Sequence, residues 1–130
     1  MTQTGTRQTG TERYTDAVAR YFAAWNADGD GTAGAVAAAF TEDATYTDPL
    51  ADVAGHDGLA AVIAGVHAQF PGFVFRPLGD PDGHHGLVRF GWELVAPDGS
   101  APVAGSDVAA LAADGRISSV AGFLDRVPAA

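Results

Sequence analysis

The chain contains no cysteine, which excludes disulfide bonds, thiolate nucleophiles and metal centres held by cysteine. This absence is compatible with the cytoplasm, where we expect the protein to reside. Basic residues are also few: 7 Lys and Arg face 16 Asp and Glu, which gives a formal net charge of −9. An acidic chain repels phosphate backbones and anionic lipids, so we expect no nucleic acid and no membrane among its partners. No apolar run approaches the ~20 residues that a membrane-spanning helix needs.

The 130 residues, of which 47% are hydrophobic, suffice for one globular domain with a core of ordinary size. The first ten residues, MTQTGTRQTG, have no apolar segment and so do not form a secretory signal. Their Thr, Gly and Gln content predicts a disordered tail over residues 1–10. We therefore expect a single domain over residues 11–130.

Three helices are predicted in the first half of the chain. The first covers about residues 11–26, because large apolar residues recur at spacings of three and four on one face, namely Tyr14, Val18, Tyr21 and Trp25. A short second helix begins near Thr32. A third begins near Asp57 and ends before Pro71-Gly72.

The remainder of the chain is predicted to be strands separated by turns. A short strand at 44–47 precedes the third helix, and four longer strands follow it, at about 73–78, 84–96, 103–112 and 116–127. Clusters of Gly, Pro and Asp predict the turns, among them GDPDG at residues 79–83. Three helices before an antiparallel meander indicate an α+β architecture, with the helices on one face of a curved sheet.

Asp48 is the first candidate for acid–base chemistry. It follows the short strand and precedes Pro49, which disfavours helical geometry at Asp48 and keeps it extended at the end of the strand. A carboxylate in that place can lie beside the mouth of a pocket. In the alternative interpretation, the Asp48 side chain only stabilises the turn that the proline begins.

Asp107 is the second candidate, because it lies in a strand of Val, Ala and Gly residues. Burial there would raise the pKa of the Asp107 carboxyl, whereas on the outer face it would be an ordinary solvated residue. In the strand at 84–96, alternation allows one histidine of the pair His84 and His85 to enter a pocket, and Gly86 could carry a bulge that exchanges them. Both histidines could instead be exposed after the turn.

Three segments resemble a known family. They are Val18-Ala-Arg-Tyr21, Asp43-Ala-Thr-Tyr-Thr-Asp48-Pro49, and Ser106-Asp107-Val108 followed by Asp114-Gly-Arg-Ile117. With the order of the elements, they resemble the NTF2-like superfamily, in particular its Δ5-3-ketosteroid isomerases and SnoaL-like polyketide cyclases. The resemblance covers about residues 12–127. It implies a cone-shaped α+β fold with three N-terminal helices packed on a curved, mixed, mostly antiparallel sheet, and a homodimer that pairs through this sheet.

The resemblance also implies a small-molecule enzyme that moves a proton on an apolar carbonyl substrate, with no cofactor and no metal. In the isomerase form, Asp48 takes a proton from the carbon beside the carbonyl, and Tyr21 and a protonated Asp107 bond the enolate oxygen. In the cyclase form, Asp107 is itself the acid–base group of an aldol ring closure. The expected substrate-binding residues are Trp25, His84, His85, Phe90, Trp92 and Phe123.

Other functions stay open at this point. A non-catalytic NTF2-like module that binds a small ligand or dimerises would have the same fold, and Tyr21 would then be an ordinary core residue. The least supported alternative is an epoxide hydrolase of this fold, with Arg89 as its arginine. Two carboxylates that face one closed apolar cavity would favour catalysis, and a filled core behind them would favour the module.

Overall fold

The computed structural model describes residues 10–128, as three helices and one six-stranded sheet. The helices are α1 (Gly10–Asn26), α2 (Gly31–Ala39) and α3 (Gly55–Gln69). The strands are β1 (Phe40–Thr47), β2 (Asp52–Ala54), β3 (Val74–His84), β4 (Leu87–Val95), β5 (Val103–Leu111) and β6 (Ile117–Arg126). They lie in the order β2-β1-β6-β5-β4-β3. β1 and β6 pair in parallel and the other pairs are antiparallel, so the predicted α+β class with a mixed, mostly antiparallel sheet is confirmed.

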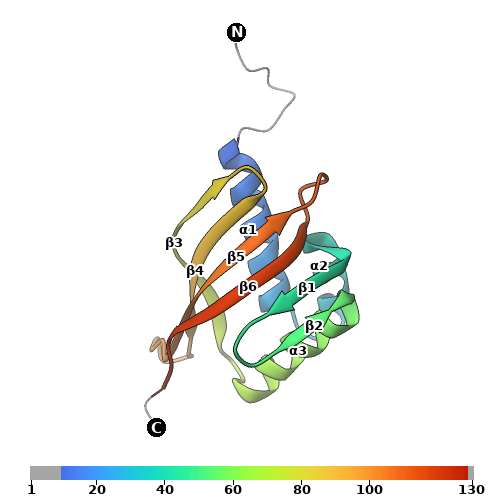
Figure 1. Cartoon of the computed structure of the whole chain (residues 1–130). Coiled ribbons are helices and arrows are strands. Elements are labelled where there is room, and N and C mark those ends of the chain that lie inside the picture. Colours follow the sequence, from blue (N-terminus) through green and yellow to red (C-terminus); the bar gives the residue numbers. More distant parts are fainter. Residues whose placement is uncertain (1–9, 129–130) are drawn as a thin grey trace.

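The helices cover one face of the curved sheet, and α1 runs behind the strands along this face (Figure 1). The stripe predicted on the first helix is confirmed, since Tyr14, Val18, Tyr21 and Trp25 are all buried. They pack with inward-facing residues of the sheet and with the fully buried side chains of Phe40, Leu59 and Ile63. No helix within residues 10–128 is long and apolar enough to cross a membrane.

The turn predicted at residues 79–83 is wrong, because β3 continues through this segment to His84. The pairing of β3 with β4 shifts register between Leu78 and Asp82, so the extra residues form an irregularity within the strand. The hairpin closes instead at His85, whose φ is 50°, and at Gly86. The Tyr14 hydroxyl donates to the His85 carbonyl oxygen at 2.7 Å and so fixes the turn against α1.

The sequence did not predict β2, a strand of three residues that pairs with the end of β1. The first strand is also longer than expected and begins at Phe40, directly after α2. Of the tail predicted for residues 1–10, residues 1–9 lie outside the part that the structure describes, and Gly10 already begins α1.

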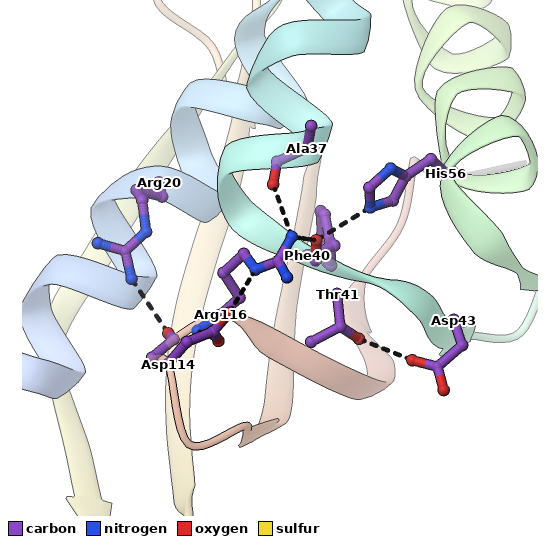
Figure 2. Close-up of polar contacts among 9 residues, drawn as sticks. Arg20, Ala37, Phe40, Thr41, Asp43, His56, Asp114 and Arg116 are labelled. Atoms are coloured by element: carbon purple, nitrogen blue, oxygen red, sulfur yellow. Dashed lines mark hydrogen bonds and ion pairs between the residues drawn. The ribbon is translucent and has the colours of Figure 1, made fainter.

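A polar cluster fixes β1 where it leaves α2 (Figure 2). Arg116 donates from Nη1 to the carbonyl oxygens of Ala37 at 3.3 Å and Phe40 at 3.2 Å. His56, at the start of α3, donates from Nε2 to the same Phe40 oxygen at 2.9 Å. Carbonyl groups at the end of a helix have no partner within it, and a cationic side chain satisfies them well. The start of β1 is therefore bonded to both α3 and the β5–β6 hairpin.

Candidate active site

A cavity of about 180 Å³ lies between α1, α3 and the inner face of the sheet. Its wall is mostly apolar and contains aromatic side chains from four elements, among them Tyr21, Trp25, Tyr46, Phe75 and Trp92. Two carboxylates, Asp48 and Asp107, also line it, and its lining within the described residues includes no Lys, Arg or His. The two candidate carboxylates therefore face one apolar cavity.

Asp107 lies on the inner face of β5, between the exposed residues Ser106 and Val108. It is only 2% exposed and is the one buried charged side chain within residues 10–128. The Tyr21 hydroxyl donates to Asp107 Oδ2 at 2.5 Å, and Trp92 Nε1 donates to Asp107 Oδ1 at 3.1 Å. Burial raises the pKa of Asp107 to about 6, against the opposing effect of these two hydrogen bonds. The carboxyl is thus mostly ionised at neutral pH, yet it can be protonated readily.

This state differs from the neutral Asp107 that the isomerase form of the resemblance requires. The isomerase form requires Asp107 to donate a hydrogen bond to the substrate, whereas both of its oxygens are already engaged as acceptors, by Tyr21 and by Trp92. The pKa is raised in the expected direction, but it stays below neutrality because Tyr21 and Trp92 stabilise the charged form. The geometry fits a carboxylate that acts as a base better than one that acts as a fixed acid.

Tyr21 lies against the ring of Phe90, at 4.8 Å between centroids, and contacts Phe22 and Phe40 edge-on. Burial first, and the nearby charge of Asp107 second, raise the pKa of Tyr21 well above its ordinary value. Tyr21 is therefore a neutral phenol that donates. Phe90, expected to bind substrate, is buried behind Tyr21 and is not part of the cavity wall, so its role is to support that ring.

Asp48 directly follows β1 and is anchored by three hydrogen bonds. Its Oδ1 accepts the backbone N–H groups of Leu50 and Ala51, both at 2.8 Å, and its Oδ2 accepts the Tyr46 hydroxyl at 2.5 Å. The turn interpretation and the pocket interpretation therefore both describe its geometry. The carboxylate closes the turn after Pro49 and also lines the cavity.

Sequence reasoning missed Tyr46, whose hydroxyl bonds Asp48 and whose ring lies 5.4 Å from that of Trp25. Burial, followed by the hydrogen bond to Asp48, raises the pKa of Tyr46 above its ordinary value, so this phenol also stays neutral. A signal was available, since Tyr46 stands two residues before Asp48 and an extended chain places such residues on one face. Phe75 and Leu124 also line the cavity and were not predicted.

Trp25 and Trp92 line the cavity as expected, whereas three residues besides Phe90 that were expected to bind substrate do not. His84 and His85 are exposed where the β3–β4 hairpin closes, near Tyr14 in the first half of α1, while Trp25 lies in the last turn of that helix. Phe123 is 62% exposed, because it pairs with the outward-facing Ser106. The expectation that these three side chains enter the pocket is therefore corrected.

Arg89 is also on the outer face, where its guanidinium pairs with Asp82 at 3.0 Å. It is not among the residues that line the cavity. An arginine between two catalytic carboxylates is the basis of the epoxide hydrolase alternative. The position of Arg89 removes the observation on which that alternative depended.

Comparison with known proteins identifies the family to which the chain belongs. The family model described as a SnoaL-like domain matches residues 18–120, so the chain belongs to the SnoaL-like family. One similar structure is a protein of this family from Agrobacterium tumefaciens str. C58, provisionally named an isomerase. It is 39% identical, with a TM-score of 0.83, and the match covers 88% of this chain and 98% of that chain.

Two more distant structures share the fold. A SnoaL-like protein from Jannaschia sp. CCS1, provisionally named a polyketide cyclase, is 20% identical with a TM-score of 0.72, and the match covers 95% of this chain and 92% of that one. A protein with a ketosteroid isomerase-like fold from Catenulispora acidiphila, in complex with trimethylamine, is 19% identical with a TM-score of 0.68, and the match covers 83% and 84%. Among curated proteins, none matches this chain.

Proposed function

We propose that the protein is an enzyme that moves a proton at the carbon beside a carbonyl group of a small, apolar substrate. The observation that carries this proposal is Asp107, a buried carboxylate with a pKa of about 6 that lines an apolar cavity. A general base works best when its pKa lies near the pH at which the enzyme operates. Such a reaction needs only acid–base and hydrogen-bonding side chains, so no cofactor is invoked.

In the proposed step, an oxygen of Asp107 takes the proton, and the electron pair of the broken C–H bond moves into the carbonyl group to give an enolate. In an isomerisation, Asp107 returns the proton to another carbon. In an aldol cyclisation, the enolate carbon bonds a second carbonyl carbon, and the resulting alkoxide takes the proton back from Asp107. Both sequences leave the enzyme unchanged, and both benefit from a carboxyl that gains and loses a proton near neutral pH.

Tyr21 and Asp48 have different supporting roles in this proposal. Tyr21 holds Asp107 in place, and it can bond a substrate oxygen only by releasing Asp107 Oδ2. Asp48 is the second carboxylate of the cavity and a further acid–base candidate, although its Oδ1 is engaged by two backbone amides. Because Tyr21 is bonded to Asp107 and Asp48 is engaged by backbone amides, these contacts favour the cyclase form of the chemistry, in which Asp107 is the base.

Hydrogen–deuterium exchange tests this proposal without knowledge of the substrate. A panel of cyclic ketones and β-diketones is incubated with the protein in deuterated water, and loss of the α-proton signal is followed by NMR. We expect exchange with the wild type and a loss of roughly 100-fold or more in Asp107→Asn. The Asp48→Asn substitution should reduce the exchange rate by a smaller factor. Equal exchange in the wild type and Asp107→Asn would reject Asp107 as the base.

A second candidate function is a binding module for a small organic cation. Its supporting observation is the cavity wall, which combines two carboxylates with several aromatic rings and includes, among the described residues, no cationic side chain. Aromatic faces and carboxylates attract quaternary and protonated amines. Calorimetry with tetramethylammonium and with tert-butanol, a neutral molecule of similar shape, tests this candidate. Selective binding of the cation together with absence of proton exchange would favour the module.

We also propose a homodimer that pairs through the outer face of the sheet, with the protein in the cytoplasm. Phe123 and Val108 are exposed on this face, and the strands that carry them are neighbours. Burial of exposed aromatic and aliphatic side chains is the usual driving force for such pairing.

A further inference from the structure

Two glycines on the inner face of the sheet stand directly opposite the residues that form the Trp92–Asp107 hydrogen bond. Gly105 on β5 pairs with Trp92 on β4, and Gly122 on β6 pairs with Asp107 on β5. Neither glycine has a positive φ, so neither is required by backbone conformation. What each position provides is space on the buried face.

Gly105 allows the indole of Trp92 to lie directly on the strand. A methyl group built on Gly105 would lie 2.3 Å from Cζ2 and 2.5 Å from Cε2 of Trp92, well inside van der Waals contact. Cε2 is bonded to Nε1, the atom that donates to Asp107 Oδ1. A side chain at this position would therefore lift the indole and move its donor away from Asp107.

Gly122 leaves open the space between the two carboxylates. A methyl group there would lie 2.8 Å from Asp107 Oδ1, 3.5 Å from Asp107 Cγ and 3.4 Å from Asp48 Cβ. The first of these is the oxygen that accepts the Trp92 hydrogen bond. The contact with Oδ1 is closer than van der Waals distance, whereas the other two are ordinary contacts, so a substitution would displace the Asp107 carboxylate before it displaced the backbone.

We infer that Gly105 and Gly122 are positioning residues, whose missing side chains let Trp92 reach Asp107 and keep the gap between Asp107 and Asp48 open. The inference rests on the proposed function only where it concerns catalysis, because the hydrogen bond and the gap exist whatever the reaction. Gly122 is the better position for a test, because its closest contacts are to side chains only. A methyl group on Gly105 would also lie 2.6 Å from the Phe123 carbonyl oxygen and disturb the sheet itself.

The test follows the titration of Asp107 by carboxyl-carbon NMR, together with the Nε1–H resonance of Trp92. In Gly122→Ala the displaced Oδ1 loses the Trp92 donor, so the Asp107 midpoint should rise by about one pH unit and the Trp92 resonance should shift. Trp92→Phe should raise the midpoint similarly. Because both substitutions remove the same bond, the double variant should shift the midpoint no further than either single variant.

Gly65→Ala is the matched control, since a methyl group on Gly65 of α3 meets nothing within 4 Å, and its Asp107 midpoint should equal that of the wild type. An unchanged midpoint and an unchanged Trp92 resonance in folded Gly122→Ala would overturn the inference. If that variant does not fold, an unchanged midpoint in Trp92→Phe overturns it instead. This test does not depend on turnover. If the Asp107 midpoint and the Trp92 resonance shift as expected but no ketone exchanges its proton, the proposed function is rejected and this inference stands.

Discussion

The Tyr46 hydroxyl donates to Oδ2 of Asp48, two residues further along the chain, at 2.5 Å. This bond joins a buried phenol to a carboxylate, whereas the similar bond of Tyr14 has a neutral acceptor, the carbonyl oxygen of His85. Hydrogen bonds to charged groups contribute about 1.5–3 kcal/mol, against about 1 kcal/mol for neutral pairs.

Tyr46→Phe should therefore lower the free energy of unfolding by about 2 kcal/mol, and Tyr14→Phe by about 1 kcal/mol. Urea denaturation of the two variants beside the wild type measures both losses. Both substitutions remove one hydroxyl from a buried ring, so the difference between them reports the charge of the acceptor. Equal losses would mean that the bond from Tyr46 to the Asp48 carboxylate contributes no more to stability than a hydrogen bond to a neutral acceptor.

The raised pKa of Asp107 makes stability depend on pH in a defined direction. Its value of about 6, against an ordinary 3.8, means that the folded state binds the proton more readily than the unfolded state. Between these values the free energy of unfolding falls as the pH rises, by up to about 3 kcal/mol. The difference between wild type and Asp107→Asn should thus decrease from about pH 4 to about pH 7, because the other carboxyls cancel. A difference that is flat with pH would refute the shift.

The pH profile of activity separates the two forms of the chemistry. If ionised Asp107 is the base, kcat/KM should rise about tenfold per pH unit below its midpoint near 6 and level off above it. If a neutral Asp107 donates a hydrogen bond to the substrate, kcat/KM should instead fall as the pH passes 6. Proton exchange with a substrate found in the ketone panel supplies the rate. If Asp107 controls the profile, the midpoint should persist in Asp48→Asn and move to lower pH, because the nearby charge of Asp48 helps to raise the pKa of Asp107.

The proposed dimer predicts the effect of a charge on the outer face of the sheet. Phe123→Asp should convert the dimer to a monomer and leave the cavity intact, because the Phe123 side chain points away from it. Light scattering after size-exclusion chromatography measures the mass. Leu50→Asp, which charges another exposed apolar residue outside the sheet, is the control and should leave the mass unchanged. A wild type that is already monomeric would exclude the proposed pairing.

Local pattern was enough to predict the parts of the fold that depend on one element alone. The stripe from Tyr14 to Trp25 needs only helical spacing. Alternation separates the two faces of β5, but the sequence left open which face carries Asp107, and the structure places it inwards. The turn predicted at residues 79–83 was wrong because this segment belongs to β3, which is an edge strand of the sheet. Proline and glycine are tolerated at an edge, where one side of the backbone needs no partner.

The site could be predicted only in part because its contacts join distant segments. Tyr21 and Asp107 were identified through a resemblance, but their bond spans 86 positions in the sequence. Trp92 became a donor to Asp107 only through the register of β4 on β5, which one sequence does not reveal. The exposure of Phe123 followed from the same pairing, since its partner Ser106 faces outwards.

The position of β6 between β1 and β5 has a consequence for how the protein is made. Asp48 follows β1 and Asp107 belongs to β5. These two strands are joined by β6, which is the last strand in the sequence. On the ribosome, both carboxylates emerge before β6 does. Until then β1 and β5 each lack a neighbour, and the cavity has no complete wall. A nascent chain that stops short of β6 therefore carries every acidic group of the site without the site itself.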